Sequence, residues 1–167
     1  MFFLVGFMAS GKTTVGSQLA AAMELEFCDL DCRFEEITTL TIPAFFEKYG
    51  EEAFRDKESE ILRDVVNECS KRVFGTGGGC VIREENRALL DRQHVIYLKV
   101  PFEVIYKRLT AKNKSARPLA NTKSKEELRA LYKEREKWYR SVSTYCIECE
   151  DYLPSEIVAL ILNLLDH

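Results

Sequence analysis

The chain has 167 residues, of which 46% are hydrophobic and 31% charged, a balance typical of one globular domain rather than two. Its 24 lysines and arginines against 27 aspartates and glutamates give a net charge of −3, which argues against a broad basic surface for nucleic acid or an anionic membrane. No apolar run approaches the roughly 20 residues that span a bilayer, and the apolar start, Met1–Ala9, lacks the positive residues of a signal peptide. We therefore expect one domain over residues 1–167 that acts in the cytoplasm as a monomer, without nucleic-acid or membrane partners.

Short apolar runs alternate with longer helical patterns along the chain, which is typical of a parallel sheet with crossover helices. The predicted strands are Phe2–Val5, Glu26–Asp29, Arg72–Gly75, Val95–Lys99 and Thr144–Cys149. The predicted helices cover about Lys12–Met23, Glu51–Ser70, Phe102–Thr110 and Lys125–Ser141, and a last helix begins after Pro154. The sequence thus indicates an α/β fold.

Two polar stretches interrupt this alternation. Asp31–Gly50 has a helical pattern and is longer than an ordinary connection between a strand and a helix. Thr110–Lys125 is irregular and contains five positive residues and no acidic one. Irregular segments of this length inside a domain are usually functional or disordered.

The segment between the first strand and the first helix predicts a phosphate-binding loop. Gly6-Phe7-Met8-Ala9-Ser10-Gly11-Lys12-Thr13 matches the pattern G-x-x-x-x-G-K-[ST]. Glycines let the backbone bend so that consecutive N–H groups point at phosphate oxygens, and the helix N-terminus adds a positive dipole. Lys12 is expected to reach the β- and γ-phosphates, and the Thr13 hydroxyl to hold Mg²⁺. The expected ATP-binding residues of the loop are Ala9, Ser10, Gly11, Lys12, Thr13 and Thr14.

The rest of the chain narrows the class of nucleotide enzyme. Its nearest match to the guanine-reading pattern Asn-Lys-x-Asp is Asn113–Ala116, which lacks the acidic residue. The third strand leads into Gly77-Gly78-Gly79 without the closing acid that a motor ATPase would need. The acid that serves the metal must then come from elsewhere, and Asp29 at the end of the second strand is placed for it. A small-molecule kinase remains.

Asp29 and Asp31 leave the second strand at the edge where parallel sheets bind ligands. One carboxylate is expected to serve Mg²⁺ through water, and the other to hold the acceptor hydroxyl and help take its proton. The three glycines after the third strand permit close approach of the backbone to a ligand. Three arginines, at 55, 117 and 135, taken singly are as readily surface charges as binding groups.

In order and spacing these motifs resemble those of the shikimate kinases over almost the whole chain. The motifs are the phosphate-binding loop, Asp29-Leu30-Asp31, Gly50–Arg55, the triple glycine, Arg117-Pro118-Leu119, and Arg135 four residues before Tyr139. The resemblance implies transfer of the γ-phosphate of ATP to the 3-hydroxyl of shikimate, a step toward chorismate and the aromatic amino acids. It also implies a three-layer α/β/α fold like that of nucleoside-monophosphate kinases, with a five-stranded parallel sheet in the order 2-3-1-4-5.

The resemblance also implies roles for individual residues. Asp31 would bind the shikimate hydroxyls and orient the attacking one, and Arg55 and Arg135 would hold the carboxylate, which suits a planar, bidentate guanidinium. The substrate-binding set would be Asp31, Arg55, Gly77, Gly78, Gly79 and Arg135, and the catalytic groups Lys12, Asp31 and Arg117. Asp29 would join Thr13 at Mg²⁺, Arg108 would lie against the adenine, and Arg117 would also contact ATP.

Two segments would act as units around these residues. Residues 31–60 would form an acceptor-binding subregion, and residues 110–125 a lid that brings Arg117 over ATP and excludes water. Ala9 stands where the family often has glycine, which should be tolerable if Ala9 keeps a negative φ. Glu136-Lys137-Trp138 stands where a smaller, proline-containing run is frequent.

Two alternatives stay open. Another small-molecule kinase, such as a gluconate or nucleoside-monophosphate kinase, would keep the loop but would not need the arginines and glycines around a carboxylate. A regulatory module would bind the nucleotide without turnover. Cys146 and Cys149 have the spacing of half a metal or redox site, but residues three apart in a strand face opposite ways, so we expect ordinary thiols.

Overall fold

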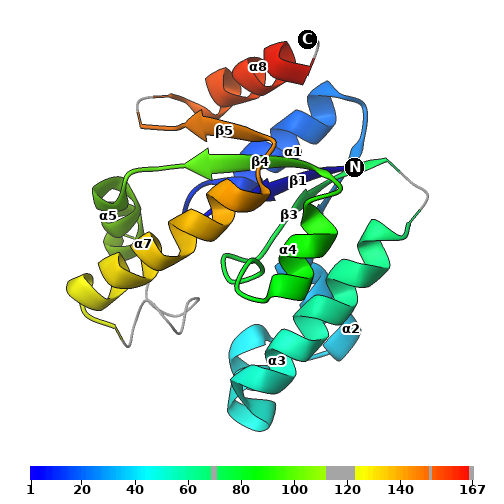
Figure 1. Cartoon of the computed structure of the whole chain (residues 1–167), viewed down its shortest axis with the longest axis vertical. Helices are drawn as coiled ribbons and strands as arrows, with labels where there is room; N and C mark the ends of the chain where they lie inside the picture. The colour runs from blue at the N-terminus through cyan, green and yellow to red at the C-terminus, as the bar shows by residue number, and fades with distance from the viewer. Residues whose placement is uncertain (69–70, 112–122, 151, 166–167) are drawn as a thin grey trace.

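The computed structural model describes residues 1–68, 71–111, 123–150 and 152–165. Its five strands are β1 (Phe2–Val5), β2 (Glu26–Asp29), β3 (Arg72–Gly75), β4 (His94–Lys99) and β5 (Tyr145–Glu148). They form one sheet in the order β2-β3-β1-β4-β5, in which every neighbouring pair is parallel (Figure 1). The fold class and the strand order that we predicted are therefore confirmed.

The strand in the middle of the sheet determines where the site lies. Phe3, Leu4 and Val5 of β1 are fully buried because helices cover both faces of the sheet. Leu4 lies opposite Gly75 of β3 on one side and Ile96 of β4 on the other. This central position brings the phosphate-binding loop, which follows β1, to the middle of the carboxyl edge.

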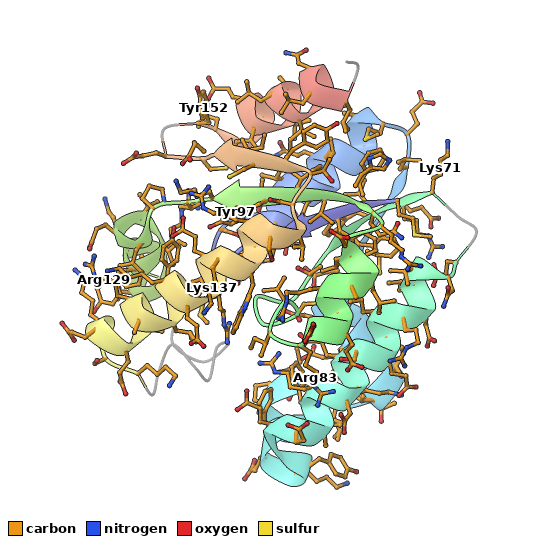
Figure 2. The ribbon with its side chains drawn as sticks, viewed as in Figure 1. Lys71, Arg83, Tyr97, Arg129, Lys137 and Tyr152 are labelled. Carbon is orange, nitrogen blue, oxygen red and sulfur yellow. The ribbon has the colours of Figure 1, made fainter. Side chains whose placement is uncertain are left out.

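The described helices are α1 (Lys12–Ala22), α2 (Leu30–Thr38), α3 (Ile42–Val66), α4 (Glu84–Leu90), α5 (Phe102–Ala111), α7 (Lys125–Val142) and α8 (Pro154–Leu165). Helices α1 and α8 pack together on one face of the sheet, and α4 and α7 lie on the other face (Figure 1). Tyr97 of β4 lies under α7 and stacks on the ring of Tyr139, with their centroids 5.2 Å apart (Figure 2). Among the described helices, none is long and apolar enough to cross a membrane.

The segment between β2 and β3 differs most from the sequence prediction. The helix predicted from Glu51 begins earlier, at Ile42, where the Thr41 side chain caps it by accepting a hydrogen bond from the Ala44 N–H at 3.4 Å. Gly50 then interrupts it with φ 80° and ψ 174°, a conformation that glycine adopts without steric cost. The polar excursion is thus α2 and the first part of α3. We did not predict the short helix α4.

Candidate active site

A cleft of about 780 Å³ opens at the carboxyl edge of the sheet. The residues that line it include the loop Ala9–Thr14, Asp29, Asp31, Arg55, Gly77–Gly79, Arg108 and Arg135. Every site residue predicted from the sequence, apart from Arg117, therefore lies in one cleft. Arg117 and most of the predicted lid fall in residues 112–122, outside the described part of the chain.

The phosphate-binding loop wraps around its own lysine. The Lys12 ammonium donates hydrogen bonds to the carbonyls of Gly6 at 2.9 Å and Phe7 at 3.0 Å. Gly6 has φ 153°, and a Cβ there would meet Ser10 Oγ at 2.8 Å and Leu98 O at 2.9 Å, so this position has no room for a side chain. The loop therefore has a concave backbone with a cation at its mouth, at the start of α1.

Ala9 corrects one expectation. It has φ 62°, whereas tolerance of alanine at this position was predicted to require a negative φ. The left-handed conformation costs an ordinary residue about 1 kcal/mol relative to glycine, because its Cβ crowds the following carbonyl. The loop requires this turn, and the Ala9 carbonyl accepts a hydrogen bond from Arg108 Nη1 at 3.1 Å. Arg108, on α5, thus lies over the loop.

Asp29 connects the start of α1 with the start of α2 through its two carboxylate oxygens. Its Oδ2 accepts a hydrogen bond from the Thr13 hydroxyl at 2.7 Å, and its Oδ1 accepts one from the Asp31 N–H at 3.0 Å, which caps α2. Hydroxyl and carboxylate oxygens are the hard ligands that Mg²⁺ prefers, and it usually takes one or two protein groups besides water and phosphate. Thr13 and Asp29 therefore fit such an ion. No group of three or more histidine, cysteine or acidic side chains among the described residues could hold a metal.

Two buried arginines flank the triple glycine. The exposed fractions of Arg55 and Arg135 are 7% and 4%, and the Nε atom of each has no hydrogen-bond partner among the described residues. Arg135 Nη1 donates to the Gly78 carbonyl at 3.1 Å, and a Cβ on Gly79 would lie only 2.4 Å from Arg55 Nη1. Burial lowers the pKa of Arg135, and the charge of Arg55 adds to this. Two buried cations with unused donors favour an anionic ligand.

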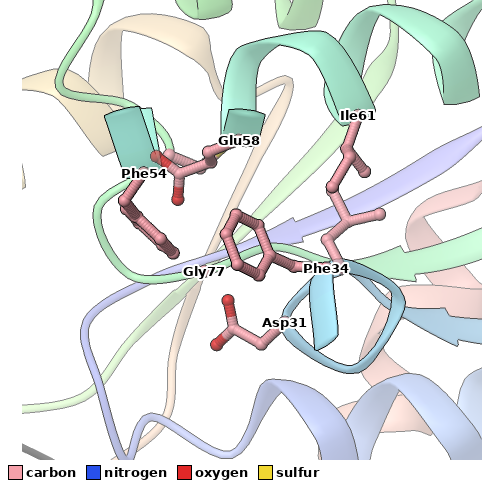
Figure 3. A pocket seen from close by; sticks show the side chains of 8 residues that line it. Asp31, Phe34, Phe54, Glu58, Ile61 and Gly77 are labelled. Atoms are coloured by element: carbon pink, nitrogen blue, oxygen red, sulfur yellow. The ribbon is translucent and has the colours of Figure 1, made fainter. Parts of the chain in front are cut away.

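Glu58 is a site residue that we did not predict. It pairs with Arg55 Nη1 at 2.7 Å from three residues further along α3, and burial raises its pKa, partly opposed by the charge of Arg55. The carboxylates of Glu58 and Asp31 line the same small cavity of about 10 Å³, beside Gly77 (Figure 3). A Cβ on Gly77 would meet Asp31 Oδ1 at 2.7 Å and Glu58 Oε1 at 3.0 Å, so the missing side chain lets both acids approach. The i to i+3 spacing after Arg55 was a signal that could have identified Glu58.

Cys146 lies in β5, and Cys149 directly follows that strand. Cys146 is exposed and Cys149 is buried, so the two side chains face differently, as the strand assignment predicted. Cys149 lines the cleft together with Tyr152 and Pro154. Burial raises the pKa of the Cys149 thiol to about 12, which keeps it protonated near neutral pH.

Comparison with known proteins points to one family. The family model described as shikimate kinase matches residues 8–166. The chain is 39% identical to the shikimate kinase of Enterococcus faecalis over 163 residues, which cover 97% of this chain and 96% of that protein. It is 40% identical to that of Dictyoglomus turgidum over 163 residues, covering 96% and 94% of the two chains. The solved shikimate kinase from Acinetobacter baumannii in complex with shikimate matches with a TM-score of 0.92 and 37% identity, covering 98% of this chain and 91% of that one.

Proposed function

The chain belongs to the shikimate kinase family, and we propose that the residues gathered in its cleft carry out that family's reaction. The activity is the transfer of the γ-phosphate of ATP to the 3-hydroxyl of shikimate, which gives ADP and shikimate 3-phosphate in the shikimate pathway. The proposal concerns which side chains bind each substrate and what each does during the transfer.

The observation that carries the proposal is the pair of buried guanidinium groups around the glycine backbone. Arg55 and Arg135 are each more than nine-tenths buried. The Nε atom of each has no hydrogen-bond partner within the described part of the chain. Shikimate carries one carboxylate, and a planar guanidinium binds a carboxylate with two parallel hydrogen bonds. We assign the carboxylate to these two arginines, and contact with the rest of the acceptor to the backbone of Gly77, Gly78 and Gly79.

Asp31 is the residue that would act on the attacking hydroxyl. It lies in the first turn of α2, where the positive end of the helix favours a carboxylate. It lies beside Gly77, and both residues line the cleft that also contains the phosphate-binding loop. There it would accept a hydrogen bond from the hydroxyl, orient it toward the γ-phosphate and take its proton as the new bond forms.

The nucleotide side would rely mainly on positioning and positive charge. The backbone of Ala9, Ser10 and Gly11 would cradle the phosphates, with Lys12 moving from its carbonyl partners to the β- and γ-phosphates and Thr14 close by. Arg108 would lie against the adenine, and Arg117 would approach the γ-phosphate. Thr13 and Asp29 would hold Mg²⁺, which when bound neutralises phosphate charge.

Several broader assignments also belong to this proposal. Residues 31–60 would form the acceptor-binding subregion of a single domain, and residues 110–125 a lid that carries Arg117. We propose that the protein acts as a monomer in the cytoplasm. The free thiols at Cys28, Cys32, Cys80, Cys146 and Cys149 suit a reducing compartment.

The test is ADP release by the purified protein with Mg²⁺-ATP, with and without shikimate. Strong shikimate dependence supports the proposal, whereas activity with gluconate or nucleoside monophosphates instead would overturn the assignment of the acceptor. Tight ATP binding without any acceptor-dependent release would favour a regulatory module.

Substitution of the arginines tests the carboxylate contact itself. Arg55→Lys and Arg135→Lys should each raise the KM for shikimate about tenfold and leave the KM for ATP unchanged, because lysine keeps the charge but loses the bidentate geometry. Arg92→Lys is the matched control, since Arg92 is exposed and outside the cleft. A shikimate carboxamide should bind the wild-type protein poorly. Its affinities for wild type and for Arg55→Lys should differ little. If the amide is as good a substrate as shikimate, the arginines do not bind the carboxylate.

A further inference from the structure

The loop that carries the triple glycine is held from α4 by side chains outside the cleft. Asn86 Nδ2 donates to the Cys80 carbonyl at 2.9 Å, and Arg87 Nη1 donates to the carbonyls of Val81 at 2.8 Å and Ile82 at 2.7 Å. Three consecutive carbonyls after Gly79 thus accept hydrogen bonds from two adjacent residues of α4. The position of residues 80–82, the outer end of the glycine loop, therefore depends on α4.

The inner end of the same loop is held from α7. Gly78 O accepts hydrogen bonds from Arg135 Nη1 at 3.1 Å and from the Tyr139 hydroxyl at 2.5 Å. Trp138 lies between these two residues in the sequence and is the only tryptophan of the chain. The loop therefore depends on the spacing between α4 and α7, which pack side by side (Figure 1).

The side chain of Arg87 bridges α4 and α7. Its guanidinium carbon lies 5.3 Å from the centre of the Trp138 ring, within the range of a cation–π contact, while its Nη1 holds the two carbonyls. Lys137, labelled on α7 in Figure 2, places its ammonium 5.2 Å from the centre of the same ring. One side chain thus joins the end of the glycine loop to the helix that carries Arg135.

We propose that Arg87, seated on Trp138, is a positioning residue for the acceptor side of the site. It sets the glycine backbone at the distance from α7 at which Gly78, Gly79 and the Arg135 guanidinium can contact one ligand together. This inference rests on the proposed function, in which these three groups bind shikimate. Arg87 itself lines neither the cleft nor the small cavity beside it.

Loss of Arg87 should shift the loop without unfolding it. The Cys80 N–H still donates to Gly77 O at 3.2 Å, the Ile82 N–H to Gly79 O at 3.0 Å, and Asn86 still holds Cys80 O. A displacement on the order of 1 Å at a binding group can cost up to about a hundredfold in rate. We expect Arg87→Ala to lower kcat/KM for shikimate about tenfold, mainly through KM, with the KM for ATP within about twofold of wild type.

The experiment compares wild type with Arg87→Ala, Arg87→Lys and Trp138→Leu. Arg83→Ala is the control, because the Arg83 side chain also joins elements, through Glu52 and Asp56 on α3, but it pairs with acidic side chains instead of holding the loop carbonyls or the Trp138 ring. Each variant is assayed for both KM values, kcat and thermal midpoint. Trp138 fluorescence is also titrated with shikimate in every protein that retains the tryptophan.

The expected pattern separates positioning from stability alone. Arg87→Lys should recover part of the shikimate affinity, Arg87→Ala should weaken the fluorescence response to shikimate, and Arg83→Ala should lower only the thermal midpoint. If Arg87→Ala keeps the wild-type KM for shikimate, or if Arg83→Ala raises it as much, the inference is wrong. If Arg87→Ala does not fold, Trp138→Leu decides because it removes the aromatic ring, and a wild-type KM for shikimate there overturns the inference. Absence of shikimate-dependent ADP release in wild type is instead a failure of the proposed function, and the inference falls with it.

Discussion

Replacing Gly79 with alanine would place a methyl group where the Arg55 guanidinium now lies. The added Cβ would meet Nη1 at 2.4 Å, Nη2 at 2.7 Å and Cζ at 2.8 Å, whereas ordinary contact begins at 3.4 Å. The guanidinium would have to retreat by 3.4 − 2.4 = 1.0 Å. Its side chain is only 8% exposed and is held by Glu58 at 2.7 Å, so it has little room to re-form the same contacts.

The cost follows from the interaction that would be lost. A hydrogen bond to a charged group contributes about 2 kcal/mol, and about 1.4 kcal/mol corresponds to a factor of ten, so kcat/KM for shikimate should fall about 30-fold. The KM for ATP should stay within about twofold, because the methyl group faces Arg55 and not the phosphate-binding loop. Gly75→Ala is a matched control, since its Cβ is also crowded, at 3.1 Å, but against Phe27.

The assay is initial-rate ADP release against shikimate at saturating ATP. It compares wild type, Gly79→Ala, Arg55→Ala and the double variant. If the alanine acts through Arg55, the double variant should be no worse than Arg55→Ala, within about twofold. Losses that multiply, or an equal rise in the KM for ATP, would refute the reasoning.

Four further predictions concern other residues of the cleft. Asp31→Asn should abolish turnover while ATP affinity, measured by calorimetry, stays near wild type; an equal loss of ATP affinity would contradict the role of Asp31. Arg117→Ala should lower kcat more than it raises the KM for shikimate, and the reverse in steady-state kinetics would make it a plain binding residue. Burial raises the pKa of Glu58 above its ordinary 4.5, so the folded protein holds this proton more tightly than the unfolded chain. The resulting stabilisation is complete below pH 4.5 and is lost as pH rises through the folded-state pKa. In denaturant unfolding from pH 4.5 upward, the free energy of unfolding of wild type should therefore fall relative to that of Glu58→Gln. If the difference between the two free energies does not change with pH, the pKa of Glu58 is not raised. Ala9→Gly should change the free energy of unfolding by less than about 1 kcal/mol, whereas the same change at exposed Ala130 in α7 should cost about 1 kcal/mol; equal losses would mean that φ at Ala9 carries no strain.

The sheet and the phosphate-binding loop could be predicted because their signals are local. Each buried strand is a short apolar run, and the loop pattern lies directly between the first strand and the first helix. The start of α3 was also readable, since Thr41 is a capping residue followed by a proline in the first turn. We predicted a helical pattern over Asp31–Gly50 but did not place the start of a helix at Ile42 within it.

Other features depend on contacts between distant residues. Helix α4 has only seven residues, and the bonds of Asn86 and Arg87 to the glycine loop help to hold it in place. The left-handed turn at Ala9 follows from how the loop closes, which side-chain identity does not reveal. The burial of Arg55 and Arg135 likewise appears only when α3 and α7 meet at the same backbone. Taken singly in the sequence, either arginine is indistinguishable from a surface charge.

The double hydrogen bonding of Asp29 has a thermodynamic consequence. One of its carboxylate oxygens accepts from Thr13 at the start of α1 and the other from the backbone at the start of α2, next to Asp31. If the two substrates bind as proposed, a ligand that draws on one oxygen would also act on the helix start that the other oxygen holds. By reciprocity of binding free energies, whatever factor the nucleotide imposes on acceptor affinity, the acceptor must impose on nucleotide affinity. Asp29 is thus a natural place to look for synergy between the two substrates.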